Sequence, residues 1–277
     1  MTAETGYFPV PEWGSIFYSH WRPEGEVRAL VLIVHGLAEH CRRYDRLADD
    51  LNAQGYAVCA LDLPGHGQSD GPRVYVDSFD VHLNAVLGLR DKMAAEYQYR
   101  PVILLGHSMG GLVGARLVQR SQQGFAALVL SAPALAVSPE PSGLLKFVVR
   151  LLSSLLPKLG VLQLDSKAVS RDAAVVEDYV SDPLNHTGKI PARTVAEMFA
   201  AMAASLENAG EVKLPLLLMH GEADTMTAVS GSRYLHEAAA SPDKSLQIYP
   251  ELYHEIFNEP EWEQVYSNLL AWLNQRF

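Results

Sequence analysis

Short apolar runs recur along the chain and alternate with segments of helical periodicity. Six of these runs are rich in β-branched and apolar side chains: residues 29–36, 56–63, 101–107, 126–133, 215–221 and 244–250. They are continuously apolar, so they predict strands that are buried on both faces of a sheet. Because helical patterns separate the early strands, the chain is predicted to form a parallel sheet with crossover helices.

Helical patterns and one hairpin complete this framework. Apolar positions at helical spacing predict a helix that starts near Tyr44 and stops before Gly55, and a second helix between Phe79 and Met93. A C-terminal helix is predicted after Pro260, because proline suits the first helical position. Before residue 26, the sequence GYFPVPEWGSIFYSHWRP predicts an edge hairpin.

The alternation of strands and helices stops between Pro133 and Pro215. Helical patterns continue through this stretch without a convincing strand. We therefore predict a core formed by residues 1–135 and 212–277, with a helical cap inserted as residues 136–211.

The predicted cap contains a strongly apolar helix near residues 143–156. Its polar residues lie on one stripe and leave a broad apolar face: Lys146, Arg150, Ser153 and Ser154. Two interpretations stay open. The face is buried against neighbouring elements, or it forms a lip that makes peripheral contact with a membrane. A second cap helix around residues 195–202 is predicted to pack in the core.

Composition narrows the class of protein and the class of partner. The 277 residues are 48% hydrophobic and carry a formal net charge of −10, which excludes a disordered chain and disfavours nucleic acid as a partner. The apolar runs are shorter than the about 20 residues that cross a bilayer. The start of the chain lacks the pattern of a signal peptide, so we expect a cytoplasmic protein. Two cysteines, Cys41 and Cys59, do not make a disulfide framework.

The strongest chemical signal is the sequence Gly106-His107-Ser108-Met109-Gly110, which lies between a predicted strand and a predicted helix. A G-x-S-x-G pattern in this context is typical of a nucleophile elbow. The serine occupies a strained turn, and the glycines allow the strand and the helix to approach closely. Ser108 is therefore the predicted nucleophile.

A serine hydroxyl needs a histidine to take its proton and a carboxylate to orient that histidine. In hydrolases with this elbow the acid and then the base follow late strands. Asp224 follows the strand at 215–221, and His254 follows the strand at 244–250 and precedes the last helix. Glu222 is the rival acid. His220 is predicted to be a satisfied core histidine.

Acyl transfer also needs donors for the oxyanion of the tetrahedral intermediate. The backbone N–H of Met109 is one candidate, and the N–H of Leu37, in the loop after the strand at 29–36, is the second. His35 is predicted to brace that loop. Glu39 and Arg43 are polar groups near the mouth of the site, or no more than a charge pair at a helix N-terminus.

Metal chemistry has little support in the sequence. There is no HExxH or CxxC pattern, and His35 and His40 have no obvious third ligand nearby, so no metal site is predicted.

Seven motifs together resemble one branch of a known superfamily: HGLAEHCRRY (35–44), LDLPGHGQSDG (61–71), GHSMGG (106–111), SAPAL (131–135), DPL (182–184), HGEAD (220–224) and YPELYHEIFNE (249–259). This set resembles the monoacylglycerol lipases and lysophospholipases of the α/β-hydrolase superfamily, over nearly the whole chain.

The resemblance implies an α/β-hydrolase fold, a Ser108–Asp224–His254 triad and an oxyanion hole at Leu37 and Met109. It also implies a mobile cap that admits one acyl chain, a lipid ester as substrate, no cofactor, and contacts from Glu39 and Arg43 to the glycerol moiety. Four alternatives stay open: a broad carboxylesterase, a lysophospholipase, an aminopeptidase of small peptides, and a non-catalytic fold that binds an apolar ligand.

Overall fold

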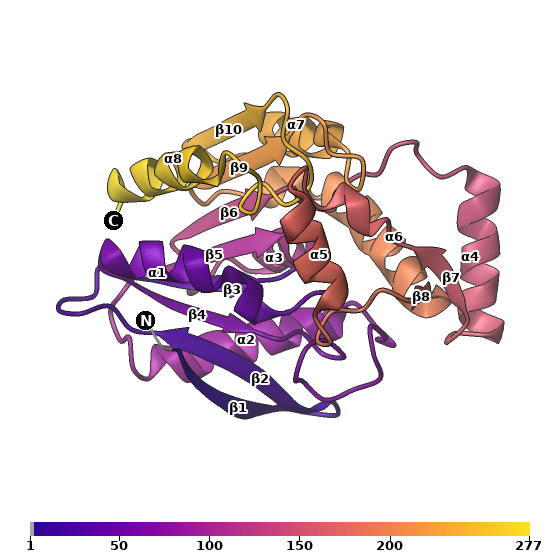
Figure 1. Cartoon of the computed structure of the whole chain (residues 1–277), viewed down its shortest axis with the longest axis horizontal. Helices are drawn as coiled ribbons and strands as arrows, with labels where there is room; N and C mark the ends of the chain where they lie inside the picture. Colours follow the sequence, from indigo (N-terminus) through magenta and orange to yellow (C-terminus); the bar gives the residue numbers. More distant parts are fainter. Residues whose placement is uncertain (1–2) are drawn as a thin grey trace.

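A computed structural model describes residues 3–277 and contains an eight-stranded, mostly parallel sheet (Figure 1). Its strands, in chain order, are β1 (Glu4–Val10), β2 (Gly14–Trp21), β3 (Ala29–Val34), β4 (Tyr56–Leu61), β5 (Val102–His107), β6 (Ala127–Ser131), β9 (Leu216–Gly221) and β10 (Lys244–Tyr249). Their order across the sheet is β1-β2-β4-β3-β5-β6-β9-β10. Strands β3, β4, β5, β6, β9 and β10 run parallel, and the predicted edge hairpin, β1 with β2, is antiparallel.

The six apolar runs all form strands, which confirms the predicted parallel sheet. Five of these strands are buried because each lies between two neighbours and under helices on both faces. The prediction of two buried faces is wrong for β10, whose residues 244–248 are only partly buried. It is the last strand of the sheet, so only β9 lies beside it.

Helices cover both faces of the sheet and create two apolar cores. The short helix η1 (Cys41–Tyr44), α1 (Asp45–Ala53) and α8 (Trp262–Asn274) pack on one face. The other face is covered by α2 (Asp80–Ala94), α3 (Met109–Arg120) and α7 (Val229–Ala238). The predicted helices α1, α2 and α8 are thereby confirmed.

Residues 136–211 are inserted between β6 and β9 and lie to one side of the sheet (Figure 1). They form α4 (Gly143–Leu155), β7 (Gly160–Gln163), η2 (Ser166–Ala168), α5 (Ala173–Ser181), β8 (Lys189–Pro191), α6 (Ala192–Glu207) and η3 (Ala209–Glu211). The prediction of an insertion without strands is wrong, since β7 and β8 pair as a small antiparallel sheet. Each is too short to show a hydrophobic period in the sequence.

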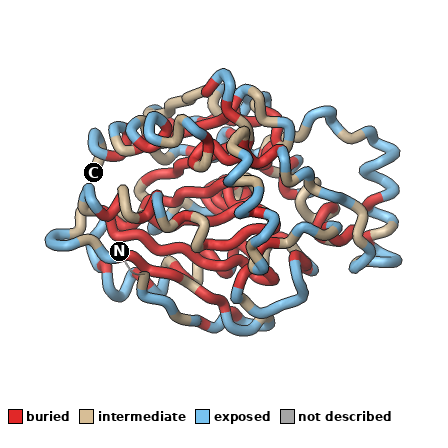
Figure 2. Tube along the Cα trace, in the orientation of Figure 1, coloured by how far each residue is buried: buried red, intermediate tan, exposed pale blue. Residues whose placement is uncertain are grey.

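The two apolar helices of this insertion have different surroundings. Helix α6 packs on α3, and its Val195 and Met202 are buried, as predicted. Helix α4 packs on α6 through a narrow face, while Leu144 and Phe147 stay 74% and 64% exposed (Figure 2). The interpretation that neighbours bury the broad apolar face of α4 is therefore wrong. In residues 3–277 no helix is both long and apolar enough to span a bilayer.

Candidate active site

Ser108 occupies a tight turn between β5 and α3. Its backbone φ of 53° and ψ of −118° is a conformation that a side-chain-bearing residue rarely adopts. The flanking glycines make the turn possible. A Cβ atom on Gly106 would lie 2.3 Å from the Gly110 carbonyl oxygen, and one on Gly110 would lie 2.1 Å from the Val34 carbonyl oxygen. The predicted strand–serine–helix turn is therefore present, with the serine held at the carboxyl end of the sheet.

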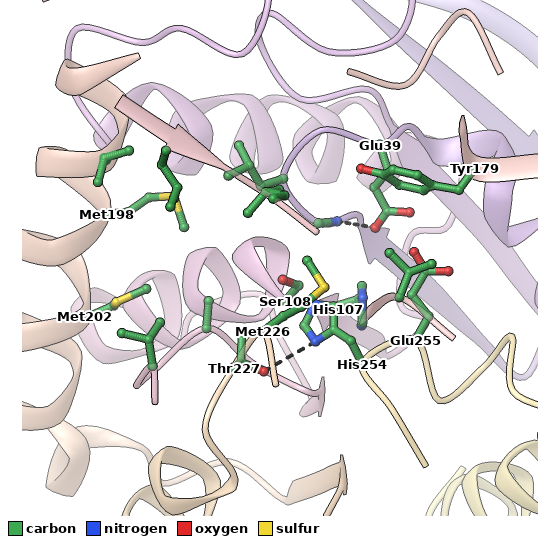
Figure 3. Close-up of a pocket in the computed structure, with 18 of the residues that line it drawn as sticks. Glu39, His107, Ser108, Tyr179, Met198, Met202, Met226, Thr227, His254 and Glu255 are labelled. Carbon is green, nitrogen blue, oxygen red and sulfur yellow. Dashed lines mark hydrogen bonds between the residues drawn. The ribbon is translucent and has the colours of Figure 1, made fainter. Parts of the chain in front are cut away.

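Two loops at the same end of the sheet bring the predicted acid and base together. Asp224 follows β9 and His254 follows β10, and His254 Nδ1 lies 2.7 Å from Asp224 Oδ2. Glu222 is exposed and binds Arg233 at 2.7 Å, so the rival acid is remote from the histidine. His254 and Ser108 line one pocket (Figure 3).

The charges in this pair are set by burial and by the neighbouring carboxylate. Burial disfavours the protonated imidazole of His254, but the charge and hydrogen bond of Asp224 outweigh it, and the pKa of His254 is raised above 6.5. Burial also opposes ionisation of Asp224. The charge of His254 and hydrogen bonds from His220, His254 and the Thr227 backbone nevertheless lower the Asp224 pKa far below its usual range. Asp224 is thus an anion next to a basic histidine.

Sequence reasoning missed two side chains that bind the same carboxylate. Thr227 Oγ1 donates to Asp224 Oδ2 at 2.7 Å, and His220 Nε2 lies 3.2 Å from the same oxygen. The prediction that His220 is a satisfied core histidine is confirmed, since it is fully buried and both ring nitrogens have partners, Ser232 and Asp224, but its contact with the acid was not predicted. The signal in the sequence was its position at the end of β9, one loop before the acid.

The loop after β3 lies directly against Ser108. A Cβ atom on Gly36 would be 3.1 Å from Ser108 Cβ, and Leu37 lines the pocket beside it. His35 braces this loop as predicted, since its Nε2 accepts from the Leu63 backbone N–H at 2.8 Å and its Nδ1 lies 2.6 Å from the Gly36 carbonyl oxygen. Met109 is the first residue of α3, and its side chain is buried in the core.

Two carboxylates, both bound to one guanidinium behind them, form the polar end of the pocket. Arg43 Nη1 donates to Glu39 at 2.8 Å and to Glu255 at 2.6 Å, and Arg43 Nη2 donates to Glu255 at 2.7 Å. Burial opposes ionisation of Glu255, but the charge and hydrogen bonds of Arg43 lower its pKa to about 2. Glu39 and Glu255 line the pocket, whereas Arg43 lies behind them, against the Tyr179 ring, and is not in the wall.

Sequence reasoning also missed Glu255. It directly follows His254, so its proximity to the site could have been read from the chain, but not its pairing with Arg43. Glu39 has a further contact, because its Oε1 accepts from the Gly36 backbone N–H at 2.6 Å. The polar end of the pocket is thus connected to the loop against Ser108.

The other end of the pocket is apolar and comes from residues 136–211. Its lining includes Val137, Leu162, Leu164, Val195, Met198, Phe199 and Met202. Figure 3 shows Met198 and Met202 on the opposite side of Ser108 from Glu39, Tyr179 and Glu255. Ser108 therefore stands between an apolar region and a carboxylate-lined region of a single pocket.

His186 and the two cysteines lie outside the lining of the pocket. His186 is absent from the pocket lining, and its backbone N–H donates to the Ala38 carbonyl at 2.9 Å. Cys41 and Cys59 are free, buried thiols whose pKa values are raised by burial, as is typical of unreactive structural cysteines. Within residues 3–277 no three His, Cys, Asp or Glu side chains are grouped so as to hold a metal ion.

Comparison with known proteins places this architecture in a family. A family model described as serine aminopeptidase S33, Hydrolase_4, matches residues 25–261. A monoacylglycerol lipase of Mycolicibacterium smegmatis is 38% identical over 93% of this chain and 92% of its own length. The human monoglyceride lipase is 34% identical over 94% of this chain and 87% of its own length.

A solved structure agrees with the sequence relatives. The crystal structure of Paleococcus ferrophilus monoacylglycerol lipase superposes with a TM-score of 0.83 at 32% identity and covers 100% of both chains. The matches span the sheet and the insertion alike, so they include every loop that contributes to the pocket. The chain therefore belongs to the Hydrolase_4 family of α/β-hydrolases and is similar to monoacylglycerol lipases.

Proposed function

We propose that the chain is a serine hydrolase that cleaves monoacylglycerols into a free fatty acid and glycerol. One observation carries the proposal: Ser108 lies between an apolar region and a carboxylate-lined region of one pocket. An ester that has one long acyl chain on one side of its carbonyl and a small polar alcohol on the other matches both regions. Relatives named as monoacylglycerol lipases support the same substrate class.

Each step of the reaction has a residue to perform it. Ser108 Oγ attacks the ester carbonyl while His254 takes its proton, and Asp224 stabilises the imidazolium that forms. The backbone N–H groups of Leu37 and Met109 bind the oxyanion. The C–O bond to glycerol breaks, and the leaving oxygen receives the proton from His254. Water then attacks the acyl-enzyme with His254 as the base, and the fatty acid leaves.

The carboxylate-lined region favours a neutral polyol as the alcohol. Carboxylates accept hydrogen bonds and do not donate them, so Glu39 and Glu255 can receive the free hydroxyl groups of a glycerol monoester. Two carboxylates face one guanidinium, Arg43, which leaves a net charge of about −1. A phosphate-bearing alcohol would be repelled, and this supports a monoacylglycerol over a lysophospholipid.

The apolar region sets how many acyl chains enter. In our proposal residues 136–211 act as the cap and residues 1–135 and 212–277 as the hydrolase core. Side chains of α6, with Leu162 and Leu164, enclose the space beyond Ser108. This supports a substrate with one chain, because a second or third chain would have to occupy the carboxylate-lined region.

The exposed face of α4 supports peripheral contact with a membrane. Besides its exposed leucines and Phe147, the stretch from residue 143 to 164 contains Lys146, Arg150 and Lys158 and has no acidic residue. Apolar side chains beside cations suit an anionic lipid surface. We propose that the enzyme works inside the cell and takes its substrate from such a surface.

Release of fatty acid from matched mono-, di- and triacylglycerols of 8 to 18 carbons tests the proposal, with Ser108→Ala protein as the blank. Strong preference for the monoester is expected. Equal turnover of all three would indicate a general lipase, and no turnover of any would contradict ester hydrolysis of glycerides. Lysophosphatidylcholine tests the lysophospholipase alternative in the same assay.

The carboxylates also make an aminopeptidase the second candidate, because they could bind a substrate ammonium group. The printed description of the matching family model names that activity. The ratio of kcat/KM for monoacylglycerols to that for prolyl and leucyl arylamides separates the two, and we expect the ester to be favoured.

A further inference from the structure

Asp224 is surrounded by more donors than a triad acid needs to orient one histidine. Its Oδ1 accepts from the backbone N–H groups of Met226 at 2.7 Å and Thr227 at 3.0 Å. Its Oδ2 meets His254 Nδ1 at 2.7 Å, Thr227 Oγ1 at 2.7 Å and His220 Nε2 at 3.2 Å. Two histidine rings therefore bind one carboxylate oxygen.

The tautomer of His220 follows from its two partners. An ionised carboxylate can only accept, so the ring nitrogen that faces it, Nε2, must bear the proton. The other nitrogen, Nδ1, is then an acceptor, and Ser232 Oγ lies 2.7 Å from it. Ser232 belongs to α7 and is fully buried, as is His220. A hydrogen-bonded chain thus runs from α7 through His220 to the acid, and it is complete with His220 neutral.

We infer that His220 is a positioning residue for the hydrolytic reaction: its Nε2–H fixes Asp224 Oδ2 against His254 and withdraws part of the carboxylate's charge from that imidazole. The inference rests on the proposed Ser108–His254–Asp224 mechanism. His220 itself does not line the pocket, and its Nε2 contacts Asp224 at 3.2 Å and the Thr227 hydroxyl, which binds the same carboxylate oxygen, at 3.3 Å, so it acts through Asp224 and not on the substrate.

The electrostatic consequence has a definite sign. An N–H dipole directed at Asp224 also has its positive end toward the His254 imidazolium, which it destabilises. Removal of this donor leaves more of the carboxylate's charge for His254, so the pKa of His254 rises. The other groups that face His254 keep their charge in that variant: the Thr227 hydroxyl, 3.4 Å from Nδ1, the His107 ring, whose centroid lies 4.8 Å from that of His254, and Glu255, Glu39 and, behind them, Arg43.

The test compares His220→Leu with His220→Gln, since glutamine keeps an N–H near the position of Nε2. Ser108 is titrated with a fluorophosphonate, so that kcat refers to folded active sites. For His220→Leu we expect kcat per site to fall about tenfold with KM unchanged. The acid limb, which is the rise of kcat/KM with pH on the low-pH side of the profile, should move to higher pH by about half a pH unit. His220→Gln should keep kcat within about threefold of wild type, and its acid limb should lie at the same pH as that of wild type. His236→Leu, in the last turn of α7, is the matched control and should change neither kcat per site nor the acid limb.

A purely structural role of His220 predicts a different result. The fluorophosphonate would then label fewer active sites, while kcat per site and the acid limb would stay unchanged. That result, or a limb that moves to lower pH, would overturn the inference. Should His220→Leu fail to fold, the ¹⁵N spectrum of wild-type protein decides, because a proton on His220 Nδ1 contradicts the assignment and a proton on Nε2 supports it. Wild-type protein that is neither labelled at Ser108 nor active on esters would instead contradict the proposed function.

Discussion

The two ends of the pocket are built in different ways. At the carboxylate-lined end, loops that follow the strands hold each polar group by several hydrogen bonds. Glu39, for example, accepts hydrogen bonds from Gly36, Arg43 and Tyr44. At the apolar end, Met198, Phe199 and Met202 meet the pocket through packing, with flexible side chains on one helix. Satisfied hydrogen-bond networks make the groups that they connect rigid, whereas methionines adapt to what they contact.

This difference separates the chemistry of the site from its selectivity for chain length. Attack on a carbonyl tolerates little displacement of the reacting groups, so the reacting end needs rigid support. An acyl chain of variable length needs only apolar surface. Substitutions at the two ends should therefore have effects of different size and different kind.

Replacement of the nucleophile should have the largest effect. Ser108→Ala removes the atom that attacks, so fatty acid release should fall by about 10⁴-fold or more while the melting temperature stays near that of wild type. The assay is titration of fatty acid released from a monoacylglycerol. Ser230→Ala, an exposed serine on α7, is the control. Residual activity near that of wild type would mean that another group attacks.

The acid should come next, and it offers a matched pair. Asp224→Asn keeps the shape but removes the charge that stabilises protonated His254, so kcat should fall by about 10³- to 10⁴-fold. Glu222→Gln alters an exposed side chain that binds Arg233 and should stay within about twofold of wild type. The reverse order of the two kcat values would reject Asp224 as the acid.

Much of the rigid end could be predicted from the sequence, because local patterns specify it. Ser108 was predicted from the glycines that its turn requires, and Asp224 and His254 from their places after two late strands. Thr227, Glu255 and the contact of His220 with Asp224 were missed. Their interactions depend on how loops from β9, β10 and β3 meet in space, and no spacing along the chain encodes that distance.

The insertion was harder to predict for a different reason. Periodicity shows that α4 has an apolar face, but it cannot show what covers that face. The sequence therefore left burial and exposure open, and the structure leaves Phe147 and Leu155 mainly exposed. Strands β7 and β8, of four and three residues, are shorter than any pattern that alternation could reveal.

At the apolar end, substitutions should change selectivity and spare the chemistry. Met198 lines the pocket from α6, and Met198→Trp would fill space that a long chain needs. We expect kcat/KM for a 16-carbon monoacylglycerol to fall about 30-fold and that for an 8-carbon one to change less than about threefold. Met202→Leu conserves volume and serves as the control. Equal losses for both chain lengths would mean that α6 does not bound the acyl chain.

The exposed face of α4 should matter only when the substrate is presented on a surface. Phe147 and Leu151 are 64% and 48% exposed, so replacing both by serine should leave the melting temperature and the turnover of a dissolved 8-carbon ester unchanged. Binding to anionic vesicles should weaken about tenfold. Sedimentation with vesicles measures this, and undiminished binding would assign the membrane contact to another surface.

The smallest effect should come from charge at the rigid end. Catalysis requires neutral His254, whose pKa is raised above 6.5, so kcat/KM should reach half its maximum at a pH above 6.5. Glu255 raises the His254 pKa by its negative charge, and Glu255→Gln removes that charge. The pKa of His254 should then fall, and the acid limb should move to lower pH by a few tenths of a unit. At a pH on that limb, kcat/KM expressed as a fraction of its maximum should be about twofold higher than in wild type. A limb that moves to higher pH would contradict the charge that we assign to Glu255. Because Met198→Trp alters no charge, it should leave the limb in place, so the two ends of the pocket can be told apart by pH profile as well as by chain length.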